Sequence, residues 1–304
     1  MGKIVVIGSA NIDCTKEVHE FPTEGSEQNE ISSTYGFGGK GTNQAIAASR
    51  SGSEVSFIGC IGEDEYSRKI VGNLESNGID VKGVKAVLGL KKPDGRTIYV
   101  RGHDGENAMT GYGEAIGHLT PEVIEGRRED LDNADIIIIQ YKMPKESVDF
   151  VIEYCKENRK KLIVNPAPPE QAKLDISKMS SITYLTPNQY EAPELFPGLS
   201  FEEIVTRYPN VIITLGKDGV MYYDNGAVKT LPALEVECID TTGAGDTFTG
   251  AFATAVSEGK SLEEAVLFGR TAAGMKVKQK GAQPGIPNRP EIEKAIRNER
   301  EEIR

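Results

Sequence analysis

Short apolar runs that alternate with helix-patterned segments constrain the fold of this chain more than any other feature of its sequence. The run Ile136–Ile139 is typical, because it has the length of a buried strand and the helix-patterned segment Lys145–Asn158 follows it. Repeated alternation of this kind indicates βαβ units, so we predict an α/β fold with a central, mostly parallel sheet. The predicted strands are Lys3–Gly8, Val55–Gly59, Ala134–Gln140, Leu162–Asn165, Ile182–Leu185 and Val211–Leu215, and the predicted helices between them include Asn43–Ser51, Ser67–Asn77 and Lys145–Asn158.

Two regions interrupt this alternation, Ile12–Phe37 and Gly95–Gly113. Within the second, Arg96–Arg101 has the β-branched and aromatic content of a strand. We predict that both regions form a small β-sheet lid, with segments at about 12–37 and 95–113 of a single domain that spans residues 1–304. The segments Ser261–Lys280 and Arg289–Arg304 are predicted to be helical, and the second is rich in charged residues, as a solvated surface helix would be.

Composition and charge exclude several classes of protein. The net charge of −11 disfavours non-specific nucleic-acid binding and favours a small-molecule site, where local N–H groups, cations or a metal would hold an anionic substrate. The longest apolar runs are strand-sized, so no membrane span is predicted. The cysteines Cys14, Cys60, Cys155 and Cys238 lack zinc-site spacing, and no secretory signal is recognisable, so we expect reduced thiols in a cytoplasmic protein.

A glycine-rich turn, Asp240–Asp246, carries the clearest chemical signal and opens the apolar helical segment Thr247–Val256. Gly243 and Gly245 permit backbone conformations in which successive N–H groups converge, and a helix N-terminus adds partial positive charge. The turn therefore predicts an anion site suited to phosphate oxygens. From the turn alone, Asp246 is either a helix cap or a general base that takes a hydroxyl proton during phosphoryl transfer.

A second glycine-rich turn, Phe37–Asn43, also precedes a predicted helix, and it lacks the spacing of a P-loop. Its Lys40 and Asn43 are either hydrogen-bond donors to a polyol or parts of a tight strand-to-helix turn. Asn11 and Asp13 follow the first predicted strand, at the edge where open α/β folds bind ligands. They are either ligands of sugar hydroxyls or an Asx turn that leads into the lid.

The segment Asn188–Glu191 follows another predicted strand and opens a helix. One interpretation is an N-cap with an acidic residue in the first turn. The other is a hydrated magnesium site, because Mg²⁺ keeps several waters and needs few protein carboxylates beside nucleotide phosphates.

Taken together, these motifs resemble the ribokinase family of carbohydrate kinases, also called the PfkB family. The resemblance runs nearly from end to end, and the order of the motifs is more specific than any one of them. It implies a ribokinase-like three-layer α/β/α fold and a phosphotransferase that acts on an alcohol group of a sugar. The matching stretches are Gly8–Asp13, Gly38–Asn43, Asn165–Pro168, Leu185–Glu191, Thr214–Gly216, Asp240–Phe248 and Lys280–Pro284.

The resemblance also implies roles for individual residues. Asp246 would be the catalytic base, and the N–H groups of Gly243, Ala244 and Gly245 would stabilise the transferring phosphoryl group. The positions that match the sugar site are Asn11, Asp13, Gly39, Lys40 and Asn43. Those that match the nucleotide site are Asn188, Thr214, Gly216, Gly243 and Gly245.

Two metal ions follow from the same resemblance. Glu191 matches a position that holds Mg²⁺ through water. A potassium-like monovalent cation would be bound by Asp240, Thr242 and backbone carbonyl groups around Lys276, Gln279, Gly281 and Gly285. The implied partners are ATP and a small sugar, and the β lid would close over the sugar and carry a homodimer contact.

Three departures from the family pattern concern the substrate. Lys142 stands where family members commonly place a glutamate that contacts the sugar, and an ammonium group there suits an anionic acceptor. Glu114–Ile116 replaces a Gly-Ala-Asn sequence at the end of the second lid segment, and Arg270 replaces an Asn or His near the nucleotide base. The alternative for Lys142 is a surface lysine that points into solvent.

These observations leave several functions open. The first hypothesis is transfer of the γ-phosphoryl group of ATP to the 5-hydroxyl of D-ribose or a close relative. The second is a kinase of a phosphorylated sugar such as ribose 1-phosphate, with ADP as a possible donor and with Lys142, Arg96 or Arg101 on the existing phosphate. A nucleoside kinase is a third option. The non-enzymatic alternative is a sugar or nucleotide sensor that binds its ligands without turnover.

Overall fold

The computed structural model describes residues 2–90, 94–101, 107–167 and 176–302. Residues 102–106 of the second predicted lid segment lie outside this part of the chain, as do Pro168 of one predicted motif and the last two residues of the predicted C-terminal helix.

A six-stranded sheet forms the centre of the molecule, with strand order β10-β9-β8-β1-β4-β5. Every neighbouring pair in it is parallel, which confirms the predicted α/β fold. The strands are β1 (Lys3–Ile7), β4 (Glu54–Ile61), β5 (Asp80–Ala86), β8 (Ile136–Gln140), β9 (Lys161–Asn165) and β10 (Tyr184–Leu185).

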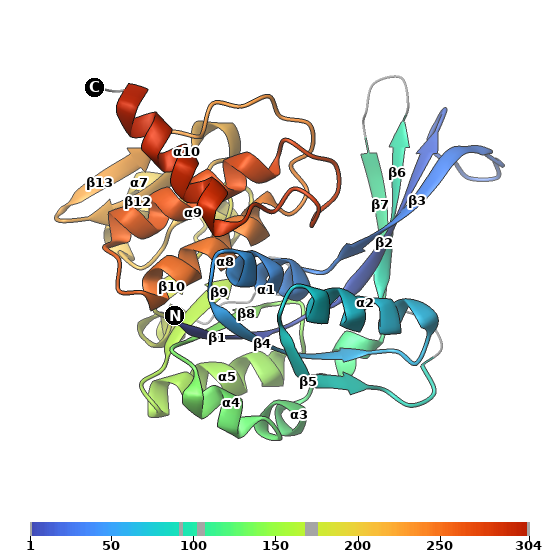
Figure 1. The fold of residues 1–304 in the computed structure, drawn as a ribbon, viewed down its shortest axis with the longest axis horizontal. Helices are drawn as coiled ribbons and strands as arrows, with labels where there is room; N and C mark the ends of the chain where they lie inside the picture. Colours follow the sequence, from blue (N-terminus) through green and yellow to red (C-terminus); the bar gives the residue numbers. More distant parts are fainter. Residues whose placement is uncertain (1, 91–93, 102–106, 168–175, 303–304) are drawn as a thin grey trace.

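Both faces of this sheet are buried, because successive side chains of each strand point to opposite sides. In β1, Ile4 and Val6 belong to one hydrophobic cluster, whereas Val5 and Ile7 belong to the other. Helices cover both faces and complete the predicted three layers (Figure 1). One layer contains α1 (Lys40–Arg50), α2 (Glu65–Ser76), α8 (Ala244–Ser257), α9 (Leu262–Lys276) and α10 (Arg289–Glu302), and the other contains α3 (Pro121–Glu125), α4 (Arg128–Asn133) and α5 (Lys145–Glu157).

The region after β10 differs from the prediction. The predicted strand Val211–Leu215 joins the parallel sheet only through single bridges, one of which pairs Val211 with Leu185. Its core, β11 (Ile213–Thr214), instead starts a separate antiparallel sheet, because the turn at Gly216–Asp218 leads the chain straight back along it. That sheet also contains β12 (Val220–Asp224) and β13 (Ala227–Leu231), and the short helices α6 (Glu191–Leu195) and α7 (Phe201–Arg207) precede it.

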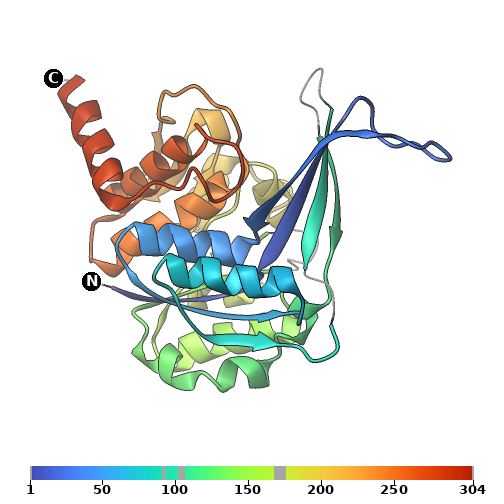
Figure 2. The ribbon, with the colours of Figure 1, turned by 45° about the vertical axis from the view of Figure 1, so that its right-hand side comes forward.

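A four-stranded sheet projects from the body of the molecule, with strand order β3-β2-β6-β7 (Figures 1 and 2). Its strands are β2 (Asn11–Val18), β3 (Glu30–Gly38), β6 (Gly95–Arg101) and β7 (Asn107–Tyr112). Two antiparallel hairpins are joined by a parallel pairing of β2 with β6. The strands come from the two segments predicted as the lid, and β2 and β3 connect directly to β1 and α1.

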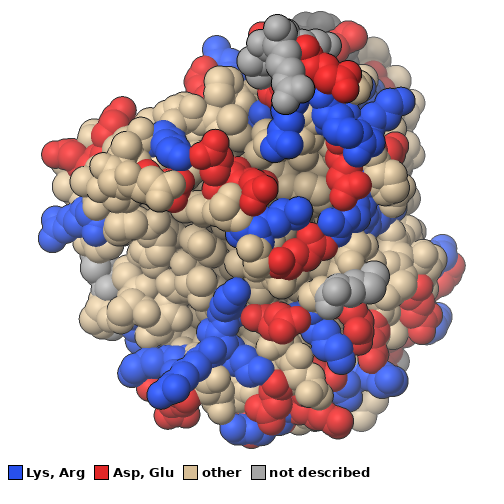
Figure 3. Space-filling model, turned by 60° about the vertical axis from the view of Figure 1, so that its left-hand side comes forward, with Lys and Arg blue, Asp and Glu red and all other residues tan. Residues whose placement is uncertain are grey.

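The surface shown in Figure 3 carries Lys and Arg side chains interspersed with Asp and Glu, so the coloured residues of this face form no large field of one sign. Within the described ranges, no helix is both long enough and apolar enough to span a bilayer.

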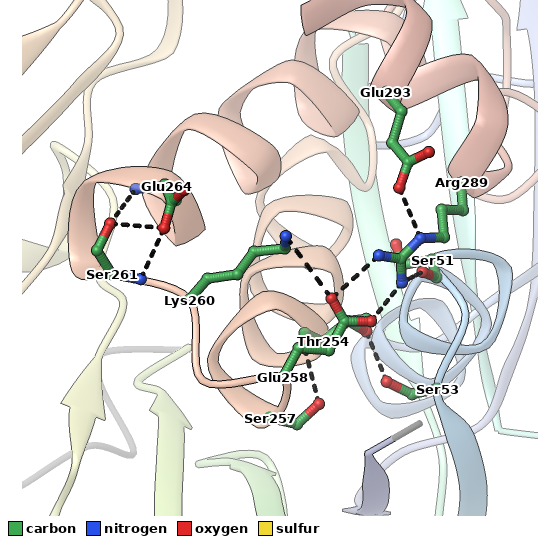
Figure 4. A network of polar contacts seen from close by, with 10 residues as sticks. All are labelled: Ser51, Ser53, Thr254, Ser257, Glu258, Lys260, Ser261, Glu264, Arg289 and Glu293. Atoms are coloured by element: carbon green, nitrogen blue, oxygen red, sulfur yellow. Dashed lines mark hydrogen bonds and ion pairs between the residues drawn. The ribbon is translucent and has the colours of Figure 1, made fainter.

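An ion-pair network ties the start of α10 to the ends of α1 and α8 (Figure 4). The Arg289 guanidinium donates two hydrogen bonds to the Glu258 carboxylate, one of them at 3.0 Å, and donates to Glu293 at 2.8 Å and to the Ser51 carbonyl at 3.3 Å. Beside this cluster, the Ser53 hydroxyl donates to the Thr254 hydroxyl at 2.9 Å. The bidentate geometry makes the pair of Arg289 with Glu258 stronger than an ordinary surface ion pair.

Replacement of Glu258 by glutamine is expected to lower the free energy of unfolding by about 1 kcal/mol at neutral pH, a value reduced for partial exposure. The hydrogen bond from Arg289 holds the pKa of Glu258 below its ordinary value. The stabilisation is therefore complete above that ordinary value and is lost as the pH falls through the lowered folded-state pKa. The unfolding free energies of Glu258→Gln and the wild type should therefore become equal at acidic pH, and urea unfolding across the acidic range measures both. Glu301→Gln, at an exposed position of α10, serves as the control.

Candidate active site

A pocket lies where the carboxyl ends of β9 and β10 meet the first turns of α1 and α8. This is the edge at which open α/β sheets bind ligands. Its lining contains predicted sugar, nucleotide and metal positions from distant parts of the sequence. The lining residues are Lys40, Asn165, Thr186, Asn188, Glu191, Thr214, Gly243, Gly245 and Asp246.

The Asp246 carboxylate is fixed by two amide side chains of α1. Asn43 donates to one carboxylate oxygen at 2.9 Å and Gln44 donates to the other at 3.0 Å. These amides are oriented in turn, because the Gln140 side chain donates to Oε1 of Gln44 at 2.7 Å and the Gln283 side chain donates to Oδ1 of Asn43 at 2.9 Å. Asp246 is 7% exposed and lines the pocket, so its carboxylate is both held in a fixed orientation and largely shielded from solvent.

The turn before α8 presents unbonded N–H groups to the same pocket. Gly243 is the N-cap residue with φ of 79°, a left-handed conformation that favours glycine. The N–H groups of Gly243 and Gly245 have no acceptor among the described residues, whereas the N–H of Ala244 donates to the Thr241 carbonyl at 3.1 Å. Of the three N–H groups predicted to bind phosphoryl oxygens, two are therefore free and one is engaged within the turn.

Gly39 positions Lys40 and Asn43 at the start of α1. Its φ is 97°, and a Cβ atom there would lie 2.7 Å from the Ser9 carbonyl oxygen and 2.8 Å from the Asn11 nitrogen. Only glycine allows this approach of the α1 turn to the end of β1. Gly39 therefore fixes the path of the backbone between the end of β1 and the start of α1.

Asn188 and Glu191 form a compact turn at the start of α6. The Asn188 side-chain oxygen accepts from the N–H groups of Tyr190 and Glu191, and one Glu191 carboxylate oxygen accepts from the Asn188 N–H at 2.9 Å. The helix itself begins at Glu191 with Tyr190 as its N-cap residue and without a side-chain capping bond, so the Asn188 side chain closes a turn before α6 and does not occupy the predicted N-cap position. Burial raises the pKa of Glu191, although the Asn188 N–H and the charge of Lys40 oppose the shift. The second carboxylate oxygen of Glu191 has no hydrogen-bond donor within the described ranges.

The residues predicted to bind a monovalent cation lie on two loops in contact. The Asp240 carboxylate accepts from the Thr242 N–H at 2.8 Å and from the Gly281 N–H at 2.7 Å. Burial would raise the pKa of Asp240, but these hydrogen bonds and the charge of Lys276 hold it below its ordinary value. A Cβ atom on Gly285 would lie 2.5 Å from the Lys276 carbonyl oxygen, so these loops are closely packed.

The predicted sugar end lies under the four-stranded sheet. Asp13 on β2 accepts two hydrogen bonds from the Arg96 guanidinium on β6, with an Nε to Oδ1 distance of 3.1 Å. The Asp94 carboxylate accepts from the N–H groups of Glu114, Ala115 and Ile116 at 2.8 to 2.9 Å. The segment Glu114–Ile116, which departs from the family pattern, therefore has a structural role here.

Lys142 follows β8 at this same end and is half-buried. Burial lowers the pKa of its ammonium group, and the charges of Arg96 and Lys40 add to that shift, while Asp94 and Asp13 oppose it. No described residue accepts a hydrogen bond from it or pairs with it. Lys142 is thus a partly buried lysine beside Arg96, Lys40, Asp94 and Asp13.

The pocket lining lacks several predicted or noted positions, among them Asn11, Gly216 and Arg270. Asn11 is 2% exposed, and its side-chain oxygen has no hydrogen-bond partner among the described residues. Gly216 is exposed on the turn after Thr214 and is not a lining residue. Arg270 pairs with both carboxylate oxygens of Glu299 at 2.7 and 2.9 Å, so its guanidinium links α9 to α10.

The protein-family model described as pfkB family carbohydrate kinase matches residues 1–289. The chain belongs to the pfkB family of carbohydrate kinases. As a family member it is a sugar kinase, which is a phosphotransferase with an alcohol group as acceptor.

Relatives and solved structures agree with the pfkB assignment. A ribokinase from Bacillus subtilis (strain 168) is 37% identical over 297 residues, which cover 97% of this chain and 100% of the relative. A solved ribokinase structure from Thermotoga maritima has a TM-score of 0.87 at 34% identity and covers 98% of this chain and 100% of that chain. The structure of Arabidopsis thaliana ribokinase complexed with ribose and ATP has a TM-score of 0.85 at 29% identity, with coverage of 97% and 98%. The predicted ribokinase-like fold is confirmed.

Sequence reasoning missed several polar residues of this pfkB-family pocket. Gln44 and Gln283 orient the Asp246 and Asn43 side chains, yet the sequence assigned them no role. Gln44 is a fully buried amide directly before the alanine-rich part of α1, and that contrast was the available signal. Asn165 and Thr186 line the pocket from the ends of their strands, where polar residues directly follow apolar runs.

Proposed function

We propose that this chain transfers the γ-phosphoryl group of ATP to the 5-hydroxyl of D-ribose. The observation that carries the proposal is the Asp246 carboxylate, held by Asn43 and Gln44 beside the free N–H groups of Gly243 and Gly245. The similarity to the Bacillus subtilis ribokinase, and to the Arabidopsis thaliana ribokinase complexed with ribose and ATP, supports this choice of acceptor and donor.

In this proposal, Asp246 takes the proton of the sugar hydroxyl as the hydroxyl oxygen attacks the γ-phosphorus. The bond between that phosphorus and the bridging oxygen of the leaving ADP then breaks. Each carboxylate oxygen of Asp246 accepts one amide hydrogen and keeps a lone pair for the hydroxyl. The N–H groups of Gly243 and Gly245 and the positive end of α8 stabilise charge on the transferring group.

Substrate-binding roles follow from the same arrangement. On the sugar side we propose Asn11, Asp13, Gly39, Lys40 and Asn43, and on the triphosphate side Asn188, Thr214 and Gly216 together with the α8 turn. Lys40 lines the pocket between the two sides, so its ammonium group is placed to neutralise charge on phosphate. We propose that residues 1–304 work as one domain whose lid segments, about 12–37 and 95–113, close over the sugar and exclude water.

Magnesium is proposed to bind beside Glu191. The buried carboxylate lines the same pocket as Asp246, and one of its oxygens has no described hydrogen-bond donor, which fits a water-mediated contact with a hard cation. When bound, Mg²⁺ neutralises charge on the β- and γ-phosphoryl oxygens. Within the described residues, no group of three or more His, Cys, Asp or Glu side chains forms a metal cluster, so Mg²⁺ would keep several waters.

The raised pKa of Glu191 predicts an acid limb in the pH profile. As the pH falls, this carboxylate is protonated at a higher pH than an exposed glutamate, so activity is lost earlier. Because Mg²⁺ competes with the proton, higher Mg²⁺ concentrations are expected to move the limb to lower pH. Rate measurements from mildly alkaline pH downward, at a low and at a high Mg²⁺ concentration, test this.

Two variants control that measurement. Glu191→Gln is expected to lower the rate by about tenfold and to remove the dependence of the acid limb on Mg²⁺. The exposed neighbour Glu194→Gln should retain the wild-type profile. An acid limb that responds to Mg²⁺ in the same way in Glu191→Gln would contradict the assignment of Glu191.

A panel of donors and acceptors tests the proposed function. ATP and ADP are each combined with ribose, ribose 1-phosphate, fructose and nucleosides, with product formation followed by ³¹P NMR. Transfer from ATP to ribose with the highest kcat/KM is the expected result. Preference for a nucleoside would move the function to a nucleoside kinase, and binding of sugar and nucleotide without any product would indicate a sensor.

One observation favours a second candidate, a kinase of a phosphorylated sugar. Lys142, Arg96 and Lys40 bring three cationic side chains to the sugar end, where Asp13 is already paired with Arg96. Asp94 is engaged by three N–H groups. The half-buried ammonium group of Lys142 thus has no described carboxylate partner of its own, and the phosphate of a ribose 1-phosphate would supply one.

A charge reversal at Lys142 separates the two candidates. If the acceptor is phosphorylated, Lys142→Glu should lower kcat/KM for ribose 1-phosphate by about a hundredfold, because repulsion replaces an ion pair. If the acceptor is free ribose, the same variant should change kcat/KM for ribose by less than about threefold. The isosteric variant Lys142→Met separates loss of the charge from its reversal.

The partner proposed for the four-stranded sheet is a second copy of this chain. Large apolar side chains on its strands are exposed, among them Ile31 at 47%, Tyr35 at 58% and Met109 at 52%. Apolar groups on a projecting sheet favour association with a complementary surface. Sedimentation velocity over a range of concentrations measures the oligomeric state, and a monomer at every concentration would refute the homodimer.

A further inference from the structure

Lys276 is a fully buried lysine, which is rare in proteins unless its charge is compensated. It is the last residue of α9, and its relative exposure is 0%. Its ammonium group donates to the backbone carbonyl oxygen of Asp240 at 2.8 Å. The negative end of the α9 dipole lies at the same place and favours a cation there.

The ammonium group lies between the two loops that shape the phosphoryl site. Backbone bonds join these loops, because the N–H groups of Ile239 and Asp240 both donate to the Val277 carbonyl, at 2.8 and 3.0 Å. The Asp240 carboxylate adds a bond to the Gly281 N–H, and the Gly243 backbone approaches Ala282 so closely that a Cβ would lie 2.9 Å from its carbonyl oxygen. The position of the Gly243 turn therefore depends on this junction.

Charge at the junction is already balanced by groups of the chain itself. Burial lowers the pKa of the Lys276 ammonium group, and the carboxylates of Asp240 and Asp246 oppose that shift and favour its charged form. Both oxygens of the Asp240 carboxylate accept backbone N–H groups, and the Lys276 carbonyl accepts from the Gln279 N–H at 3.3 Å. A second cation placed among the same oxygens would be repelled by the buried ammonium group.

We propose that the Lys276 ammonium is a fixed internal cation that holds the Asp240–Gly243 turn against the 277–285 loop and replaces the exchangeable monovalent cation expected from the family resemblance. Lys276 is a positioning residue in this account, because it acts on the phosphoryl site through the backbone of Asp240. The inference rests on the proposed kinase function only for its effect on rate. Its effect on the fold is independent of the substrate.

The first test uses the wild-type chain in chloride salts of potassium and of choline at equal ionic strength. The expected result is the same melting midpoint in both salts, because a ligand that does not bind the native state does not stabilise it. Phosphoryl-transfer rates are expected to differ by less than about twofold between the salts. A wild-type chain that melts higher in potassium, or is strongly activated by it, would overturn the proposal.

The second test removes the charge with Lys276→Met, whose side chain has a similar length. In choline its rate is expected to fall by about tenfold, and potassium should restore most of that rate and raise its melting midpoint. Lys278→Met, at an exposed position two residues further on, is the matched control and should respond to neither salt. A Lys276→Met variant with full activity in choline would refute the role of the charge.

A third variant covers the case in which Lys276→Met does not fold. Lys276→Arg keeps the positive charge, so it should remain insensitive to potassium in melting experiments, and a potassium-stabilised Lys276→Arg would count against the proposal. If no acceptor is phosphorylated, the melting comparison still decides the question. Failure of the proposed function and failure of this inference are therefore distinguishable.

Discussion

Replacement of Asp246 by asparagine is expected to lower kcat for phosphoryl transfer by about a thousandfold, a loss typical of a removed general base. An asparagine side chain has the same shape but cannot take the hydroxyl proton. It would also turn an amide nitrogen toward the donor group of Asn43 or Gln44, since both now donate to the carboxylate. Stopped-flow or quenched measurements of product formation give the rate constant directly.

Binding measurements show whether this loss belongs to the chemical step. Calorimetric titration of Asp246→Asn with nucleotide should give an affinity within about threefold of the wild type, because the α8 turn and Glu191 are unchanged. Asp218→Asn, which changes an exposed aspartate on the 216–218 turn, is the matched charge control. Transfer by Asp246→Asn at the wild-type rate would refute the mechanism.

A change of Gly243 to alanine is expected to lower kcat by about a hundredfold with a smaller change in the KM for sugar. The residue has a φ of 79°, and an added Cβ would lie 2.9 Å from the Ala282 carbonyl oxygen. The turn must shift to relieve this contact, and the N–H groups of Gly243 and Gly245 shift with it. Steady-state kinetics with varied sugar at saturating nucleotide measure both constants.

Gly226→Ala separates backbone strain from displacement of the turn. Gly226 has a similar φ of 84°, but an added Cβ there meets no atom within 4 Å, and it lies in the β12–β13 hairpin. Both alanine variants should lose about 1 to 2 kcal/mol of stability from the left-handed backbone. Only Gly243→Ala should lose activity, and equal losses of activity in the two variants would contradict the proposed role of the turn.

The central sheet could be predicted because its strands are buried on both faces and therefore appear as continuous apolar runs, as in Ile136–Ile139. The run Val211–Leu215 looks the same, yet it forms a regular ladder only with β12 and meets the segment at and after β10 through single bridges, because an apolar run does not encode its partner. A local signal was present for the next hairpin of the same sheet, β12–β13. Asn225 and Gly226 both adopt positive φ values, as the Asn-Gly turn of a two-residue hairpin requires.

The convergence of the two helix-start turns on one pocket could be predicted in part, since glycine-rich turns at helix starts indicate candidate anion sites from the local sequence. The contact of Asn43 with Asp246 joins residues 203 positions apart, so only the family resemblance connected them beforehand. The Asp13–Arg96 pair depends on the register between β2 and β6. That register follows from the three-dimensional path of two separate segments, and neither segment specifies it alone.

The residues proposed to bind the sugar and those proposed to transfer the phosphoryl group lie in separate parts of the chain. Its strands β2 and β6 carry Asp13 and Arg96, and β3 ends at Gly38, just before Lys40. The α8 turn with Asp246 comes from a stretch more than a hundred residues later. Under the proposed roles, exchange of the two projecting segments is therefore expected to change which alcohol is accepted and to leave the residues proposed for phosphoryl transfer in place.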